Sequence, residues 1–131
     1  MTIGMWSGYS DEFLIGLAAL TFVFFTIPLL LVPLRWAKLM GFEIPAHTDL
    51  AVYFGRSVGA LAAATNFAAL RAGLSGAGAA EIIGLIAAIA VMMILIHAWG
   101  AYKKIQPLSE TLEIGFWIAM ALAALAVLPP A

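Results

Sequence analysis

The stretch that decides the fold is AEIIGLIAAIAVMMILIHAWGAY, residues 80–102. After Glu81 it contains no further acidic residue and no Lys or Arg, and His97 is its one imidazole. A bilayer core about 30 Å thick needs roughly 20 apolar residues in an α-helix. The stretch is therefore predicted to be a membrane-spanning helix.

The rest of the chain repeats this pattern of long apolar runs separated by short polar connections. Four spans are expected, at about residues 13–36, 50–74, 80–102 and 110–128. Pro28 and Pro33 are expected to kink the first helix. Gly73, Gly76 and Gly78 are expected to form the second connection. Because every connection is short, the sequence predicts one domain, residues 1–131, folded as an all-α polytopic membrane protein, an antiparallel bundle of four transmembrane helices.

The overall composition agrees with a lipid environment. Of 131 residues, 65 % are apolar and 10 % are charged, whereas soluble domains have about 45–50 % apolar and about 25 % charged residues. Six basic against seven acidic residues give a net charge of −1, so nucleic acid is not an expected partner. The sequence has no Cys, which excludes disulfides, thiolate metal sites and thiol catalysis.

The distribution of basic residues predicts the orientation. Arg35 and Lys38 lie beside the first connection, Lys103 and Lys104 lie in the third, and Arg71 is on the opposite side. Cytoplasmic connections carry the excess of Lys and Arg. We therefore expect an integral membrane protein, in the inner membrane if the source is bacterial, with connections one and three cytoplasmic and both termini outside.

Three ionisable residues inside the predicted spans are candidates for a polar cluster. Arg56, His97 and Glu113 lie at similar depths, roughly 5–10 Å below the cytoplasmic interface at 1.5 Å per residue. Placing an ionisable side chain in the bilayer costs about 2.5–3.5 kcal/mol, so each of the three is expected to have a structural or functional role. In a ligand site, Arg56 would clamp an anion or headgroup, Glu113 would pair with it, and His97 would carry a proton or bind a ligand. The favoured interpretation is structural: Arg56 reaches for the headgroups or pairs with Glu113.

His97 is the candidate cofactor ligand. Its imidazole can bind haem or a chlorophyll-type pigment, but the other histidine, His47, is in a loop, which disfavours a bis-histidine haem. A hydrogen-bonded packing histidine is the favoured interpretation, and the cofactor, if there is one, stays unidentified. No HExxH or paired ExxH spacing occurs, so no metal site is predicted.

Helix packing is expected to depend on small residues. Gly55, Gly59 and Ala63 form a row at four-residue spacing, which allows close approach of helix backbones. Packing within the chain is favoured over dimerisation. Asn66 is expected to form an interhelical hydrogen bond that contributes about 0.6 kcal/mol.

Three segments resemble a known group of membrane proteins: YFGRSVG at 53–59, IHAWG at 96–100 and SETLEIGFW at 109–117. Together they are similar to small four-helix DoxX-like integral membrane proteins, over the second to fourth predicted helices. The resemblance implies a left-handed four-helix membrane bundle, and some members of that group act as companions of membrane redox enzymes.

The sequence contains no recognisable catalytic spacing, neither a nucleophile elbow nor a phosphate-binding loop. The leading hypothesis is therefore a non-catalytic accessory or scaffold subunit that docks with other subunits of a larger membrane complex, for which a redox or energy-converting complex is one candidate. The alternative is a cofactor-, quinone- or lipid-binding membrane protein that uses the level of Arg56, His97 and Glu113.

Overall fold

The computed structural model describes residues 2–130, and within that range the chain is helical with no strand. A 3-10 turn, η1 (Ser7–Tyr9), precedes the helices, and a π-helical turn, η2 (Phe22–Thr26), follows the first of them. The α-helices are α1 (Ser10–Thr21), α2 (Ile27–Leu31), α3 (Pro33–Leu39), α4 (Asp49–Ser75), α5 (Ala79–Lys103) and α6 (Leu108–Val127). The all-α prediction is confirmed.

Three helical segments are long and apolar enough to cross a membrane. They are Ser7–Leu31, Ala79–Lys103 and Leu108–Val127. The prediction of an apolar chain suited to a bilayer is confirmed for these three. The remaining predicted span, residues 50–74, corresponds to α4, which has 27 residues. Its sequence is more polar, because it includes Arg56, Asn66 and Arg71.

The predicted continuous helix over residues 13–36 is wrong. The chain leaves helical geometry at Val32 (φ −136°, ψ 53°), which separates α2 from α3. Pro33 has no N–H to donate to the carbonyl four residues earlier, and its ring disfavours the helical conformation for the residue before it. Pro33 therefore ends one helix and begins the next.

The other proline of this segment adjoins a π-helical turn. The Ile27 N–H donates to the Phe22 carbonyl, five residues back, which is the π-type spacing. Pro28 has no N–H for the Phe24 carbonyl. Trp36 replaces that donor, since its Nε1–H lies 3.1 Å from the Phe24 oxygen. A side chain from α3 thus satisfies a backbone group that the proline leaves free.

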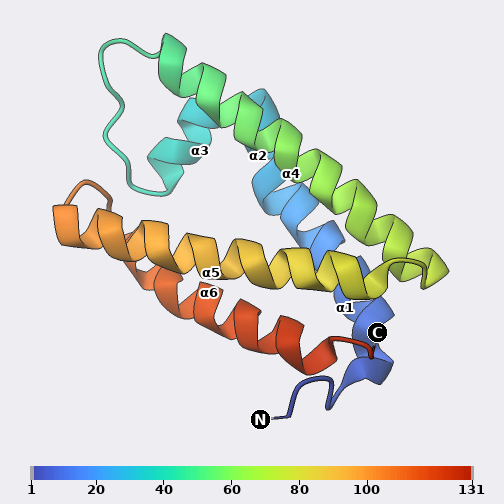
Figure 1. Cartoon of the computed structure of the whole chain (residues 1–131). Helices are drawn as coiled ribbons and strands as arrows, with labels where there is room; N and C mark the ends of the chain where they lie inside the picture. The colour runs from blue at the N-terminus through green and yellow to red at the C-terminus, as the bar shows by residue number, and fades with distance from the viewer. Residues whose placement is uncertain (1, 131) are drawn as a thin grey trace.

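The helices form two packed pairs that meet at one end of the molecule (Figure 1). α1, η2 and α2 pack along α4, and α5 packs along α6. The two pairs are joined by a tight turn in which Gly76 (φ 68°) and Gly78 (φ 77°) adopt left-handed conformations. From this turn α4 and α5 diverge (Figure 1).

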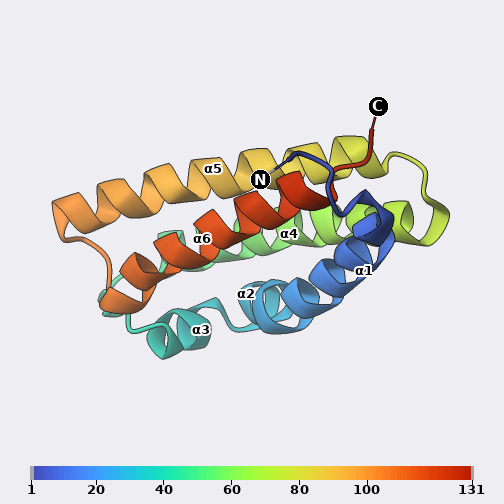
Figure 2. The ribbon, with the colours of Figure 1, turned by 90° about the horizontal axis from the view of Figure 1, so that it is seen from below.

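The apolar core lies at the end where the two pairs meet. It consists mainly of small and branched side chains from four helices: Leu14, Ala18, Ala69, Ala72, Ala79, Ile83, Ile86, Ala124 and Val127. The start of α1 and the end of α6 lie at this end as well (Figure 2). The N-terminal segment satisfies the last carbonyls of α6, because the Gly4 and Trp6 N–H groups donate to Leu125 (2.9 Å) and Ala126 (2.8 Å).

Glycines on α4 allow close contact with the first pair of helices. A Cβ on Gly55 would lie 2.7 Å from the Pro33 Cβ, and one on Gly59 would lie 2.9 Å from the Leu30 nitrogen. The small-residue row therefore faces the chain's own α2 and α3. Gly73 was expected in the second connection, but it lies inside α4 and is buried. The connection needs left-handed glycines, and those are Gly76 and Gly78.

Asn66 forms the polar link within this pair. The Thr21 hydroxyl donates to the Asn66 Oδ1 (2.6 Å), and the Asn66 Nδ2 donates to the Thr26 hydroxyl (2.9 Å). Thr26 is fully buried. Thr21 is the residue before η2 and Thr26 is its last residue, so one amide from α4 spans the π-helical turn.

Replacing Gly59 with Ala is expected to destabilise the fold by about 1–3 kcal/mol, because the new methyl group would meet backbone atoms of Leu29 and Leu30 that cannot move independently. The matched control is Gly84→Ala on α5, where a Cβ meets nothing within 4 Å. That control is expected to be neutral or stabilising by up to about 1 kcal/mol. Thermal unfolding in detergent measures both. Equal shifts of the melting temperature would show that α4 does not pack as described.

Candidate functional site

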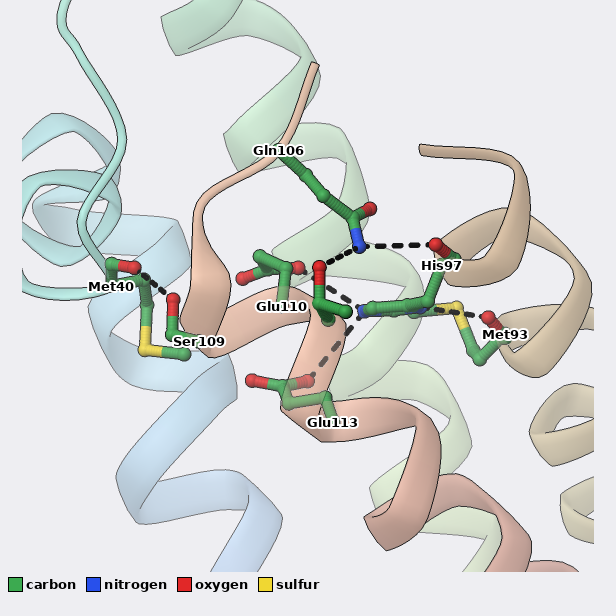
Figure 3. A network of polar contacts seen from close by, with 8 residues as sticks. Met40, Met93, His97, Gln106, Ser109, Glu110 and Glu113 are labelled. Carbon is green, nitrogen blue, oxygen red and sulfur yellow. Dashed lines mark hydrogen bonds and ion pairs between the residues drawn. The ribbon is translucent and has the colours of Figure 1, made fainter. Parts of the chain in front are cut away.

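A polar network joins α5 and α6 at the end of the molecule remote from the apolar core (Figure 3). His97 comes from the last two turns of α5, and Glu110 and Glu113 come from the first two turns of α6. Between the helices Lys104 adopts a left-handed conformation (φ 56°) that ends α5. The chain then turns back, so that the end of α5 faces the start of α6.

His97 is the centre of this network and is only 3 % exposed. Its Nδ1 lies 2.7 Å from the Met93 carbonyl oxygen. Because a carbonyl only accepts hydrogen bonds, we assign the proton to Nδ1, which donates to it. The opposite nitrogen, Nε2, lies 3.1 Å from Glu110 Oε2 and 3.7 Å from Glu113 Oε2. Glu110 and Glu113 are three residues apart and so share one face of α6.

The electrostatics of this arrangement call for a proton or a cation between the imidazole and the carboxylates. With Nδ1 protonated, a neutral imidazole would point the lone pair of Nε2 at two carboxylates. Throughout residues 2–130 the ion pairs are the two that His97 makes, and no Lys or Arg reaches these carboxylates within 4.0 Å. Buried or half-buried carboxylates are costly without a partner. A proton held within the cluster or a bound cation can supply the missing partner.

Hydrogen bonds from the α5–α6 connection fix the positions of the helix ends. The Gln106 Nε2 donates to the His97 carbonyl and to the Thr111 hydroxyl, both at 3.0 Å. The Ser109 hydroxyl donates to the Met40 carbonyl, which ends α3 (Figure 3). The first and third connections therefore lie at the same end of the molecule.

The structure brings together two of the three predicted cluster residues. His97 and Glu113 are in contact, whereas Arg56 is exposed on α4 and lines an open surface depression with Asp49 and Tyr53. The sequence predicted where these residues lie along their helices, but it did not predict the direction of each side chain around the helix. Since α4 diverges from α5, Arg56 belongs to a different part of the surface.

Glu110 and Gln106 are the site residues that sequence reasoning missed. Glu110 lies in the first turn of α6. The available signal was the three-residue spacing between Glu110 and Glu113, because this spacing puts both carboxylates on one helix face. Gln106 carried no such signal, since its partners become neighbours only when the connection folds back.

Trp117 lies one helical turn after Glu113 and is close to the histidine. Its ring centroid is 6.3 Å from that of His97, and its indole Nε1–H is a buried donor that lies near the Glu113 carboxylate. Both ring nitrogens of His97 are already engaged. A haem or chlorophyll-type pigment would therefore have to displace the carboxylates from Nε2 before it could bind there.

No protein-family model, curated protein sequence or solved structure matches the chain. The geometry of this site and the surface of the helices are therefore what indicate a function.

His97→Leu is expected to lower the free energy of unfolding by about 1–3 kcal/mol, because Glu110 and Glu113 would lose their partner and the Met93 carbonyl its side-chain donor. The matched control is His47→Leu, since His47 is exposed in the connection between α3 and α4. Thermal unfolding in the same detergent measures both. A control variant that is destabilised as strongly as His97→Leu would contradict the structural importance of the network.

Proposed function

We propose that the chain is an integral membrane protein with four antiparallel spans and that it serves as a non-catalytic accessory or scaffold subunit of a larger membrane complex. One observation carries this proposal: the long helices direct large apolar side chains outward. Exposed examples are found on each helix pair, among them Phe24, Leu61, Phe67, Leu95, Leu112 and Phe116. Surfaces of this kind need lipid or another protein to cover them.

The position of α4 supports its assignment as a membrane span in addition to the three apolar segments. At 1.5 Å per residue its 27 residues extend about 40 Å, more than the roughly 30 Å of a bilayer core. It leads from the first connection back to the Gly76–Gly78 turn, so it covers the distance between the two ends that α5 also covers (Figure 1). Arg56, two turns from its start, can extend its charge toward headgroups.

The orientation follows from the placement of the basic residues. The connections flanked by Arg35 and Lys38 and by Lys103 and Lys104 lie at one end, as the contact between Ser109 and Met40 indicates. By the positive-inside rule that end is cytoplasmic. Both termini are then outside, across the inner membrane if the source is bacterial.

Single cysteines test both α4 and the orientation, because the natural sequence has none. Ala46→Cys lies in the first connection and Ala77→Cys in the Gly76–Gly78 turn, and both positions are exposed. In intact cells a membrane-impermeant maleimide is expected to label Cys at position 77 and to label position 46 only after permeabilisation. Labelling of both in intact cells would show that α4 does not cross the membrane. The reverse pattern would show that the orientation is inverted.

The accessory role is supported by what the chain keeps inside the membrane. The longest connection between helices is the segment 40–48, which leaves little mass outside. The resemblance of 53–59, 96–100 and 109–117 to DoxX-like proteins belongs to this proposal, because it implies a four-helix bundle and, for some members, association with membrane redox enzymes.

The accessory role predicts a complex larger than the chain with its detergent. Extraction from native membranes in mild detergent is expected to give a stoichiometric assembly with another membrane protein, at a greater mass than the same chain expressed in a host that lacks its neighbours. Identical masses from the two sources, with no companion protein in stoichiometric amount, would contradict this function.

A second candidate function, that of a ligand-binding membrane protein, is supported by the buried network around His97. With Arg56 elsewhere, the cationic clamp for an anion or headgroup is missing from this network. The chemistry that His97, Glu110 and Glu113 offer is instead suited to a cation.

A further inference from the structure

We propose that His97, Glu110 and Glu113 bind one divalent transition-metal ion, with Zn²⁺ as the reference ion. The imidazole nitrogen comes from α5 and the two carboxylate oxygens come from α6. These three ligand atoms lie within 4.8 Å of one another. The proposal is independent of the accessory role and adds a binding site that the sequence did not predict.

The distances between the ligand atoms suit a shared ion. Zinc binds His nitrogen and carboxylate oxygen at about 2.0–2.2 Å, so adjacent ligands of one ion lie about 3.0–3.5 Å apart in tetrahedral or octahedral geometry. The Nε2 of His97 lies 3.1 Å from Glu110 Oε2 and 3.7 Å from Glu113 Oε2. Small rotations of the two glutamate side chains are enough to close the site.

The charge balance also favours a divalent cation. With a neutral imidazole the two carboxylates carry two negative charges, and within residues 2–130 no Lys or Arg pairs with them. A single proton in the cluster would balance half of this charge, whereas one divalent ion would balance all of it. The difference matters here because His97 is almost completely buried and electrostatic interactions are strong where water is excluded.

The histidine is already oriented as a metal ligand. Metal-binding imidazoles usually donate their other ring N–H to a carbonyl or carboxylate, which fixes the tautomer and the ring plane. The Nδ1 of His97 has this bond to the Met93 carbonyl at 2.7 Å. Gln106 adds a hydrogen bond to the His97 carbonyl. The ligand nitrogen is thereby held toward the two carboxylates before any ion arrives.

The carboxylate side of the site gives access to an ion and room for a further ligand. The side chains of Glu110 and Glu113 are 15 % and 29 % exposed, against 3 % for His97. Three protein ligands leave a position for water on a zinc ion. The buried Nε1–H of Trp117 lies near the Glu113 carboxylate and is a donor that could orient this ligand or a water beside it.

The donor set indicates which ions should bind. One imidazole and two carboxylates suit borderline divalent ions such as Zn²⁺, Mn²⁺, Fe²⁺ and Co²⁺. Ca²⁺ requires six to eight oxygen ligands, more than this site provides. The bound ion would join the last turns of α5 to the first turns of α6, at the end of this pair that lacks the apolar core.

The experiment uses the full chain in mild detergent after removal of metal with a chelator. We expect Zn²⁺ to bind at one equivalent by isothermal titration calorimetry and to raise the melting temperature, and Co²⁺ to give visible d–d absorption bands. Glu110→Gln and Glu113→Gln are expected to weaken Zn²⁺ binding at least about tenfold, as is His97→Gln. Because the two glutamine variants keep the side-chain shape and remove repulsion, they should remain folded even if His97→Gln does not.

The matched control is His47→Gln, which removes the other imidazole of the chain and is expected to leave Zn²⁺ binding unchanged. Three results would overturn the site: no saturable binding of Zn²⁺ at one equivalent, binding that survives in the Glu110→Gln/Glu113→Gln double variant, or equal affinity for Ca²⁺. None of these readouts depends on the orientation of the chain or on a partner subunit, so they do not bear on the accessory function.

Discussion

The structure depends on one constraint, which is that backbone polar groups surrounded by apolar material must find partners within the chain. Three departures from regular helix show how this is met. Trp36 donates to the Phe24 carbonyl that Pro28 leaves free, and the Ile27 N–H donates to the Phe22 carbonyl five residues back, across η2. At the other end of the chain, Gly4, Trp6 and Ser10 donate to the last carbonyls of α6.

The two ends of the molecule are held by different kinds of interaction. Where the helix pairs meet, small residues such as Ala69, Ala72 and Gly73 let α1 and α4 approach closely, and packing replaces the hydrophobic driving force that is missing between helices in lipid. At the opposite end, polar contacts around His97 and Gln106 hold α5 to α6. The polar end is therefore the part of the molecule where side chains could bind a ligand as well as hold the helices together.

The proposed functions use separate parts of this architecture. The outward-facing apolar side chains favour a subunit covered by lipid and by other membrane proteins, while the network of His97, Glu110 and Glu113 favours a bound cation. A metal ion that joins α5 to α6 is compatible with an accessory role, because it would fix the shape of a helix pair without requiring a reaction.

The sequence by itself determined the helical class, the apolar character of the chain and the positions of α4, α5 and α6, because these follow from the length of the apolar runs and from the short polar connections between them. It also identified Pro33 as a point of distortion, although it predicted a kink where the helix breaks. Only the tertiary structure decided which polar residues meet. Position along the sequence gives the height of a residue along its helix. The distance between residues on different helices is set by how α4 and α5 diverge. That divergence separates Arg56 from His97, and the turn between α5 and α6 brings Glu110 to the histidine instead.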